Sequence, residues 1–424
     1  MSEQFFHFDK KITDAAQRAL ELCAPQLKYT EEIQEYHQQK MLYAFQKAGV
    51  SESHFVSSTG YGYGDRGRDA LDEVFATVFE AEDALVRHNF VSGTHALTVA
   101  LFGVLRPGDK MVCVTGTPYD TLLGVIGIGE ETGCNSGTLK DFGIEYSQLE
   151  LKLDGTVDFE AMEQGIAPDT KMVYIQRSRG YSLRPSLLIG EIKEIARRAR
   201  ELAPGCIIML DNCYGEFIEK EEPLANGVDL MAGSLIKNPG GGIAPTGGYI
   251  AGKKELVEQC ACRLTTPSTG KEIGATLGNN RELFMGAFSA PHVTGEAVKT
   301  AIFASALFEI LGFEVSPRYC EERADIIQVL KLKTSEALTA FCRGIQKGAP
   351  VDSFVVPEPW DMPGYDSKVI MAAGAFTLGA SIELSADAPL REPYAAWMQG
   401  GLNFHSGKLG AMLAAQSMLE NGQL

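Results

Sequence analysis

This sequence of 424 residues has no long apolar run, no net positive charge and few closely spaced cysteines. No run approaches the roughly 20 apolar residues that a membrane helix needs, and the N-terminal stretch has no apolar core of signal-peptide length. The formal net charge is −17, and nucleic acid or an anionic membrane surface would repel such a chain. The sequence therefore predicts a cytoplasmic protein with neither nucleic acid nor membrane as its partner.

The cysteines are single and scattered. Nine of them, an odd number, are spread from Cys23 to Cys342. Only Cys260 and Cys262 stand close together, and neither a second pair nor nearby histidines complete a metal-binding pattern. We expect reduced, mostly buried thiols and no metal site.

What the sequence does have is a regular alternation of apolar strands and helices. Strand-like runs at 110–116, 171–177 and 206–211 alternate with helical segments at 158–166 and 189–202. This spacing indicates crossover units and a mainly parallel sheet.

We therefore predict an α/β fold with three parts. The large domain is placed at 61–312. An N-terminal helical segment at 1–60, with two successive helices inside 9–50, precedes it. A smaller C-terminal α+β domain at 313–424 follows and opens with a helix at 324–348.

The stretch from Cys206 to Gly252 carries the strongest chemical signal. Its apolar run ends in Asp211, and Lys237 follows between small residues and a glycine cluster. A desolvated lysine amine forms Schiff bases with carbonyl compounds such as pyridoxal phosphate, whose ring nitrogen needs an acidic partner like Asp211. Taken alone, the two residues could equally be a strand cap and a solvated surface lysine.

Two glycine-containing segments could approach an anion. Gly93 and Thr94 open a helix after a short strand, and backbone amides at a helix N-terminus with a hydroxyl at hand form an anion site, although Gly-Thr can also be a plain N-cap. The second segment is a loop ahead of a helix, for which the alternative is a mobile surface turn. Its candidates are Tyr61, Tyr63, Arg66 and Arg68.

Three further side chains are candidates for contacts with a ligand. Tyr119 stands at a strand-to-helix turn, where its ring could stack on a planar ligand or cap the core. Ser178 emerges at the carboxyl end of a strand, where parallel sheets bind ligands, or belongs to a solvated edge. Arg391 could bind a carboxylate through two parallel hydrogen bonds, or pair with Asp387 or Glu392.

Two motifs in this stretch resemble those of fold-type I pyridoxal-phosphate enzymes in the cystathionine and methionine lyase group. They are Asp211-Asn212 closing an apolar strand and Ser234-Leu-Ile-Lys237, with its serine three residues before the lysine. The run SLIKNPGGGIAPTGGYIAG, with the later LREPY and QGGL, is most similar to the methionine gamma-lyase-like or aluminium-resistance proteins. The resemblance covers nearly the whole chain.

The resemblance implies a seven-stranded sheet of the aspartate-aminotransferase type and pyridoxal 5'-phosphate bound covalently as an aldimine on Lys237. It implies catalytic roles for Lys237, Asp211 and Tyr119, the last covering the cofactor ring. The further implied cofactor contacts are Gly93, Thr94 and Ser234 at the phosphate, Ser178 at the ring, and Tyr61, Tyr63 and Arg68 reaching a neighbouring subunit's phosphate. Arg391 would bind the substrate carboxylate.

The implied reaction is β- or γ-elimination of a sulfur-containing amino acid, in a homodimer or homotetramer with shared active sites. Aldol cleavage, racemisation and decarboxylation start from the same bound lysine, and the residues do not separate these reactions. Two other classes stay open: a stress-related binding protein without turnover, and a nucleotide-binding oxidoreductase. The glycines at 60–67 do not follow an apolar strand in the way that a dinucleotide fingerprint requires.

Overall fold

The computed structural model describes residues 5–128, 136–361 and 367–424. The chain forms two compact units, one of His37–Ser289 and one of Met1–Tyr36 together with Ala290–Leu424. Two long helices, α1 (Lys10–Lys47) and α8 (Asn280–Ile310), each contain a boundary between the units. No helix in the described ranges has the length and apolar content needed to cross a membrane.

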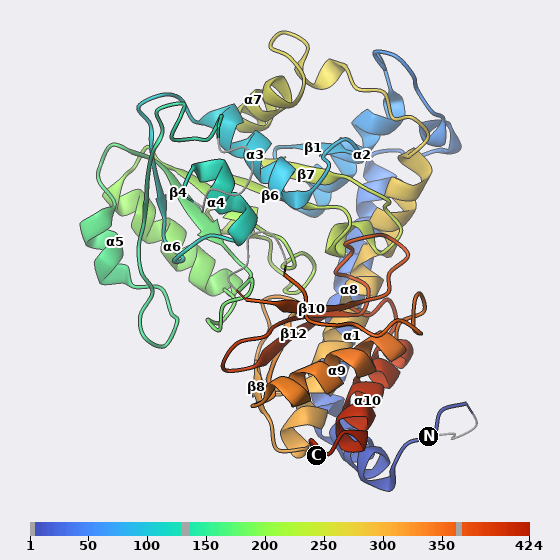
Figure 1. Cartoon of the computed structure of the whole chain (residues 1–424). Coiled ribbons are helices and arrows are strands. Elements are labelled where there is room, and N and C mark those ends of the chain that lie inside the picture. The colour runs from blue at the N-terminus through green and yellow to red at the C-terminus, as the bar shows by residue number, and fades with distance from the viewer. Residues whose placement is uncertain (1–4, 129–135, 362–366) are drawn as a thin grey trace. The chain divides into compact units, whose positions relative to one another are not determined.

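The unit of His37–Ser289 contains a seven-stranded sheet in the order β1-β7-β6-β5-β4-β2-β3. Strands β2 to β6 run parallel, and β7 is antiparallel to both of its neighbours. The neighbours β1, β7 and β6 lie side by side in Figure 1. This confirms the predicted fold class. The strands are β1 (Asp83–Arg87), β2 (Lys110–Cys113), β3 (Glu145–Gln148), β4 (Thr170–Gln176), β5 (Ile207–Asp211), β6 (Leu230–Ser234) and β7 (Gly248–Gly252).

Besides the parts of α1 and α8 in this unit, the described residues form the α-helices α2 to α7 around the sheet. Several begin at a side-chain cap, as at Ser92, whose hydroxyl accepts the amide N–H of His95, since a helix N-terminus has amides without partners. The helices are α2 (Arg66–Val78), α3 (Gly93–Val104), α4 (Asp120–Ile126), α5 (Phe159–Gly165), α6 (Ile189–Leu202) and α7 (Lys254–Leu264).

One hydrophobic core of this unit lies between the sheet and the pair α3 and α7. Alternate residues of β4, Met172 and Tyr174, point into it, as the period of a strand requires. Helices α3 and α7 pack closely because Gly103 has no side chain: a Cβ there would lie 3.0 Å from the Cα of Cys260. This close contact holds the C-terminal end of α3 against α7.

The other unit contains a five-stranded sheet in the order β10-β11-β12-β9-β8, antiparallel at every pairing. The expected C-terminal α+β fold is confirmed. Its strands are β8 (Glu314–Ser316), β9 (Gln328–Lys331), β10 (Val369–Ala373), β11 (Ser385–Pro389) and β12 (Ala395–Gln399), with helices α9 (Ser335–Lys347) and α10 (Phe404–Glu420).

Two local predictions were wrong. The two helices expected in 9–50 are the single helix α1, which continues through Pro25. The helix expected at 324–348 begins only at Ser335, because Lys333 adopts a left-handed φ of 72° and Thr334 caps the helix. The residues before it form β9, whose apolar side chains pair within a sheet rather than along a helix face.

Candidate functional site

The candidate site lies where β4, β5 and β6 end side by side. In the register of the sheet Gln176 pairs with Asp211, and Asp211 pairs with Ala232 of β6. The carboxyl ends of parallel strands are the edge at which such sheets bind ligands. Asp211, Ser234 and the segment after Gln176 are therefore presented together, as the sequence predicted.

Asp211 is buried at the end of β5, with 6% of its surface exposed. Its Oδ1 atom accepts the amide N–H of Cys213 at 3.0 Å. This bond ties the carboxylate to the turn that follows, so its direction is fixed by the backbone. A carboxylate held this way can face a cationic group without changing its rotamer.

Lys237 is half-buried and starts the short 3-10 turn Asn238–Gly240 after β6. Its Nζ atom lies over the ring of Tyr214, 4.0 Å from the centroid, a cation–π contact. Burial alone lowers the pKa of the Lys237 amine, but nearby acidic groups, with Cys213, Tyr214 and Asp211 foremost, outweigh it and raise the pKa above its ordinary value. Asp211 is thus one of the groups that favour the charged form of the lysine.

Tyr214 was not identified from the sequence. It adopts a left-handed φ of 72°, an unfavourable backbone state for a bulky residue. The side-chain amide of Asn238 holds the strained turn, because Nδ2 donates to the carbonyl of Tyr214 at 2.9 Å and to that of Glu216 at 3.1 Å. The residue after the lysine therefore fixes the aromatic ring beneath it. An aromatic residue so soon after Asp211 was the available signal.

The N-terminus of α3 meets the end of β6. A Cβ on Gly93 would lie 3.4 Å from the Cβ of Ser234, and 3.5 Å from the Sγ of Cys213. The Oγ atom of Ser234 is buried and has no hydrogen-bond partner among the described residues. An unpaired buried hydroxyl beside helix amides is suited to an anionic ligand.

Thr94 follows Gly93 in the first turn of α3. Its hydroxyl shares a hydrogen bond of 2.6 Å with that of Thr121 in α4. Gly93, Thr94 and Ser234 are thus grouped as predicted, and their contact with a phosphate stays a prediction.

Tyr119 and Ser178 are joined through Gln176 at the end of β4. The amide of Tyr119 donates to Oε1 of Gln176 at 2.7 Å, and Nε2 of Gln176 donates to the carbonyl of Ser178 at 3.0 Å. Tyr119 is half-buried, and its ring centroid lies 5.9 Å from that of Tyr181. The two residues are therefore placed at the predicted edge, while their contacts with a cofactor stay predictions.

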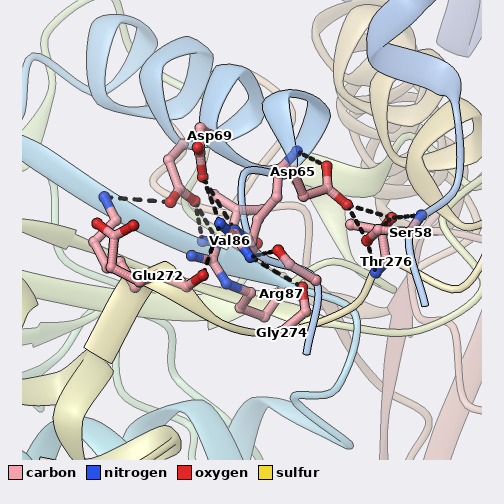
Figure 2. A network of polar contacts seen from close by, with 12 residues as sticks. Ser58, Asp65, Asp69, Val86, Arg87, Glu272, Gly274 and Thr276 are labelled. Carbon is pink, nitrogen blue, oxygen red and sulfur yellow. Dashed lines mark hydrogen bonds and ion pairs between the residues drawn. The ribbon is translucent and has the colours of Figure 1, made fainter. Parts of the chain in front are cut away.

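The loop before α2 is held by its own polar groups (Figure 2). The carboxylate of Asp65 accepts the hydroxyl of Ser58, the hydroxyl of Thr276 at 2.7 Å, and the amide N–H of Arg68 at 2.9 Å. Gly274, which Figure 2 also shows, accepts a bond from Arg68 Nη1 at 3.2 Å, and Gly62 accepts another at 2.9 Å. This network fixes the loop against the segment 272–276.

Within this loop the predicted residues differ in exposure. The guanidinium of Arg68 is buried and bonded to backbone carbonyls of its own chain, whereas Arg66 is exposed. Tyr61 and Tyr63 are 73% and 67% exposed, with ring centroids 5.6 Å apart. Their predicted contact with a neighbouring subunit is not tested by a single chain.

Arg391 lies in the turn between β11 and β12 and is exposed. Among the described residues no carboxylate is within salt-bridge distance of its guanidinium, so neither Asp387 nor Glu392 pairs with it there. Its role in substrate binding stays a prediction.

Comparison with known proteins gives the family. The family model described as methionine gamma-lyase matches residues 12–419. The uncharacterized protein YnbB of Bacillus subtilis is 49% identical over 393 residues, 93% of each chain. The structure of a carbon-sulfur lyase involved in aluminum resistance from Clostridium novyi is 50% identical with a TM-score of 0.92, covering 96% of each chain.

A more distant structure shares the fold alone. The pyridoxal-5'-phosphate dependent protein YhfS from Escherichia coli is 15% identical, with a TM-score of 0.61 over 92% of this chain and 97% of that one. The resemblance read from the lysine segment is confirmed by the family match. The chain described here belongs to the methionine gamma-lyase family.

Proposed function

We propose that this chain is a pyridoxal-phosphate-dependent carbon–sulfur lyase acting on a sulfur-containing amino acid. The observation that carries the proposal is the grouping of Asp211, Ser234 and Lys237 at one sheet edge, beside Gly93 at the start of α3. The similar Clostridium novyi protein is described as a carbon-sulfur lyase.

The residues present fit the proposed cofactor. Its phosphate needs donors, which the α3 amides and the unpaired Ser234 hydroxyl offer. Its ring nitrogen needs an acidic partner, which Asp211 offers, and its carbonyl carbon needs an amine, which Lys237 offers. When bound, the cofactor supplies an electron-accepting ring that stabilises negative charge at the α carbon of an amino acid.

The residues of this chain then have separate tasks. Lys237 would hold the cofactor through Nζ and, once released, carry a proton between Nζ and the substrate carbons. Asp211 would keep a proton on the ring nitrogen, because its carboxylate is fixed by the Cys213 amide. Tyr214 covers one side of Nζ and orients the lysine.

Substrate binding and assembly are the finer parts of the proposal. Arg391, whose guanidinium has no salt-bridge partner among the described residues, would bind the substrate carboxylate. Tyr61 and Tyr63 are exposed beside a loop that is rigid by its own bonds, as a group serving a neighbouring subunit would be. We propose a homodimer or homotetramer, and a fully active monomer in light scattering would contradict it.

The test of the proposed reaction is product analysis. Purified protein with added pyridoxal phosphate is incubated with a panel of sulfur-containing amino acids, and thiol, ammonia and oxo acid are measured. We expect all three together, with pyruvate marking β-elimination and its next homologue γ-elimination. Oxo acid without thiol would indicate a different reaction, and no product from any panel member would contradict the lyase.

A further inference from the structure

Arg177 is a buried arginine directly after β4, with 2% of its surface exposed, and the proposed chemistry does not use it. Its guanidinium binds the turn that follows β5. Nη1 donates to Oδ1 of Asn212 at 2.9 Å and to the carbonyl of Gly215 at 2.8 Å. The backbone amide of Arg177 donates to the carbonyl of Asp211 at 3.1 Å. Arg177 therefore binds the segment 211–215 at three points.

The remaining guanidinium donors of Arg177 bind groups outside that segment. Nη2 donates to Oε2 of Glu219 at 2.7 Å, and Nε donates to the carbonyl of Leu187 at 3.3 Å. The carboxylate of Glu219 also accepts the amide N–H of Ile189, the first residue of α6, at 3.0 Å. Because a guanidinium presents its donors in a fixed planar fork, these bonds fix the direction of the donors that reach the turn.

Gly215 allows this close approach of the guanidinium to the turn. A Cβ at residue 215 would lie 2.4 Å from Cδ of Arg177 and 2.6 Å from Nη1, too close for any side chain. The carbonyls on either side of Gly215, those of Tyr214 and Glu216, accept the side-chain amide of Asn238. Two side chains from other segments, Arg177 and Asn238, thus hold the backbone of this one turn.

Tyr214 carries the backbone strain of the turn. Its left-handed φ of 72° is unfavourable for a residue with a Cβ and persists only where the surroundings hold it. The strained conformation places the Tyr214 ring against Lys237, whose Nζ atom lies 4.0 Å from the ring centroid. An aromatic face attracts a protonated amine more strongly than a neutral one, and the attraction grows where water is excluded.

The same turn supplies most of the titratable groups that act on the Lys237 amine. Cys213, Tyr214 and Asp211 act on it foremost, followed by Tyr119 before α4. Glu216, in the same turn, interacts with the amine as well. All of these groups except Tyr119 belong to the segment 211–216, so the conformation of this segment determines the surroundings of the amine.

We propose that Arg177 is a positioning residue of the active site, which holds the turn after β5 so that the Tyr214 ring lies against the Lys237 amine. When the amine is released in the proposed reaction and carries a proton, the aromatic face keeps the ammonium group in place. This use of the amine rests on the proposed function. The contacts from Arg177 to the turn, and from Tyr214 to Lys237, belong to the chain itself.

The test measures how fast acetic anhydride acylates Lys237 at pH 8 in protein without added pyridoxal phosphate. Peptide mass spectrometry gives the rate relative to the exposed Lys254, an internal standard in the same protein. Only an unprotonated and accessible amine reacts. Tyr214→Leu removes the aromatic face, and we expect acylation to become about tenfold faster, the equivalent of one pKa unit. Tyr214→Phe keeps the ring and should match the parent protein.

Arg177→Met removes the donors that hold the turn, and we expect a rise in the rate ratio that approaches that of Tyr214→Leu. In the Tyr214→Leu background it should add no further rise, because both residues act through one contact. Arg87→Met is the matched control. Arg87 is also buried, and it binds the carboxylate of Asp72 and the carbonyl of Val86, each at 2.7 Å. Its loss should lower stability and leave the rate ratio unchanged.

An unchanged ratio in Arg177→Met, or an equal rise in the Tyr214→Leu background, would overturn the inference. If Arg177→Met does not fold by circular dichroism, Arg177→Lys decides. A lysine keeps the charge that faces Glu219 and loses the fork that reaches the turn, so a smaller rise is expected, and no rise would overturn the inference. If the parent protein takes up no pyridoxal phosphate, the proposed function fails, and the acylation ratios still support or overturn the role of Arg177.

Discussion

Charged and polar side chains gather in two places, at the sheet edge around Asp211 and Lys237 and in the loop before α2. The two places differ in how far these side chains are hydrogen-bonded within the chain. In the loop, Arg68 is bonded to backbone carbonyls and Asp65 accepts three donors. At the sheet edge, the Ser234 hydroxyl has no partner among the described residues, and the Lys237 amine rests on an aromatic face. Satisfied polar groups hold a structure, whereas the unpaired buried hydroxyl of Ser234 is available to a ligand.

The largest effect should come from Lys237→Ala, which removes the amine on which covalent attachment depends. We expect turnover and covalent attachment to be abolished, measured by product release and by intact-protein mass. The control is Lys253→Ala, whose lysine pairs with Asp229 at the opposite end of β6. Turnover persisting in Lys237→Ala would remove the lysine from the scheme.

Asp211→Asn should come next, because it keeps the size of the side chain and removes the charge that would hold a proton on the cofactor ring. We expect cofactor binding to be largely kept and kcat to fall about a hundredfold, as for loss of one charge-stabilising group. Steady-state kinetics with a measured cofactor content check this. An unchanged kcat would contradict the role of Asp211 in holding a proton on the cofactor ring.

In the loop before α2 we expect substitutions to change the stability of the protein, whereas at the sheet edge we expect them to change turnover. Arg68→Ala should lower the unfolding free energy by about 2–3 kcal/mol, because it removes a buried guanidinium and leaves the carbonyls of Gly62 and Gly274 without their donor. Arg66→Ala should leave stability nearly unchanged, since Arg66 is exposed. Denaturant unfolding of both variants checks this, and an equal cost would break the comparison between loop and sheet edge.

Ser234→Ala tests whether the unpaired hydroxyl is kept for a ligand. Stability without cofactor should change little, since no hydrogen bond among the described residues is lost. The Kd for pyridoxal phosphate should rise about tenfold, the equivalent of one hydrogen bond. Unchanged affinity, measured by fluorescence or calorimetry, would indicate that the hydroxyl does not contact the phosphate.

A further prediction concerns the pH dependence of stability. Burial raises the pKa of Glu222 from 4.5 to about 8. Because the folded state holds this proton more tightly, the stabilisation is fully present below pH 4.5 and is lost as pH rises through 8. Glu222→Gln should flatten the fall of unfolding free energy between these values, and an unaltered slope would contradict it.

The sequence predicted the sheet edge well because strand ends and a glycine-bounded lysine are local signals. Asp211, Ser234 and Lys237 were placed by the apolar runs before them, and the alternation of elements predicted the parallel strands. The partners that are distant along the chain were missed. Glu216 and Tyr249 meet only because Gly233 leaves room between β6 and β7.

Backbone strain and the burial of single side chains could not be predicted from the sequence either. Nothing in the residue type shows that Tyr214 takes a positive φ and lies under the lysine. The loop before α2 shows the same limit, because Arg66 and Arg68 are alike in sequence and differ only in burial. The helix expected at 324–348 failed because one left-handed residue, Lys333, separates a strand from the helix.

The most direct test of the central claim is to reduce the protein with borohydride after adding pyridoxal phosphate, and to map the modified peptide by mass spectrometry. The account predicts one pyridoxyl group, on Lys237, and none in Lys237→Ala. Modification spread over surface lysines, or placed on another single lysine, would contradict the site at the end of β6.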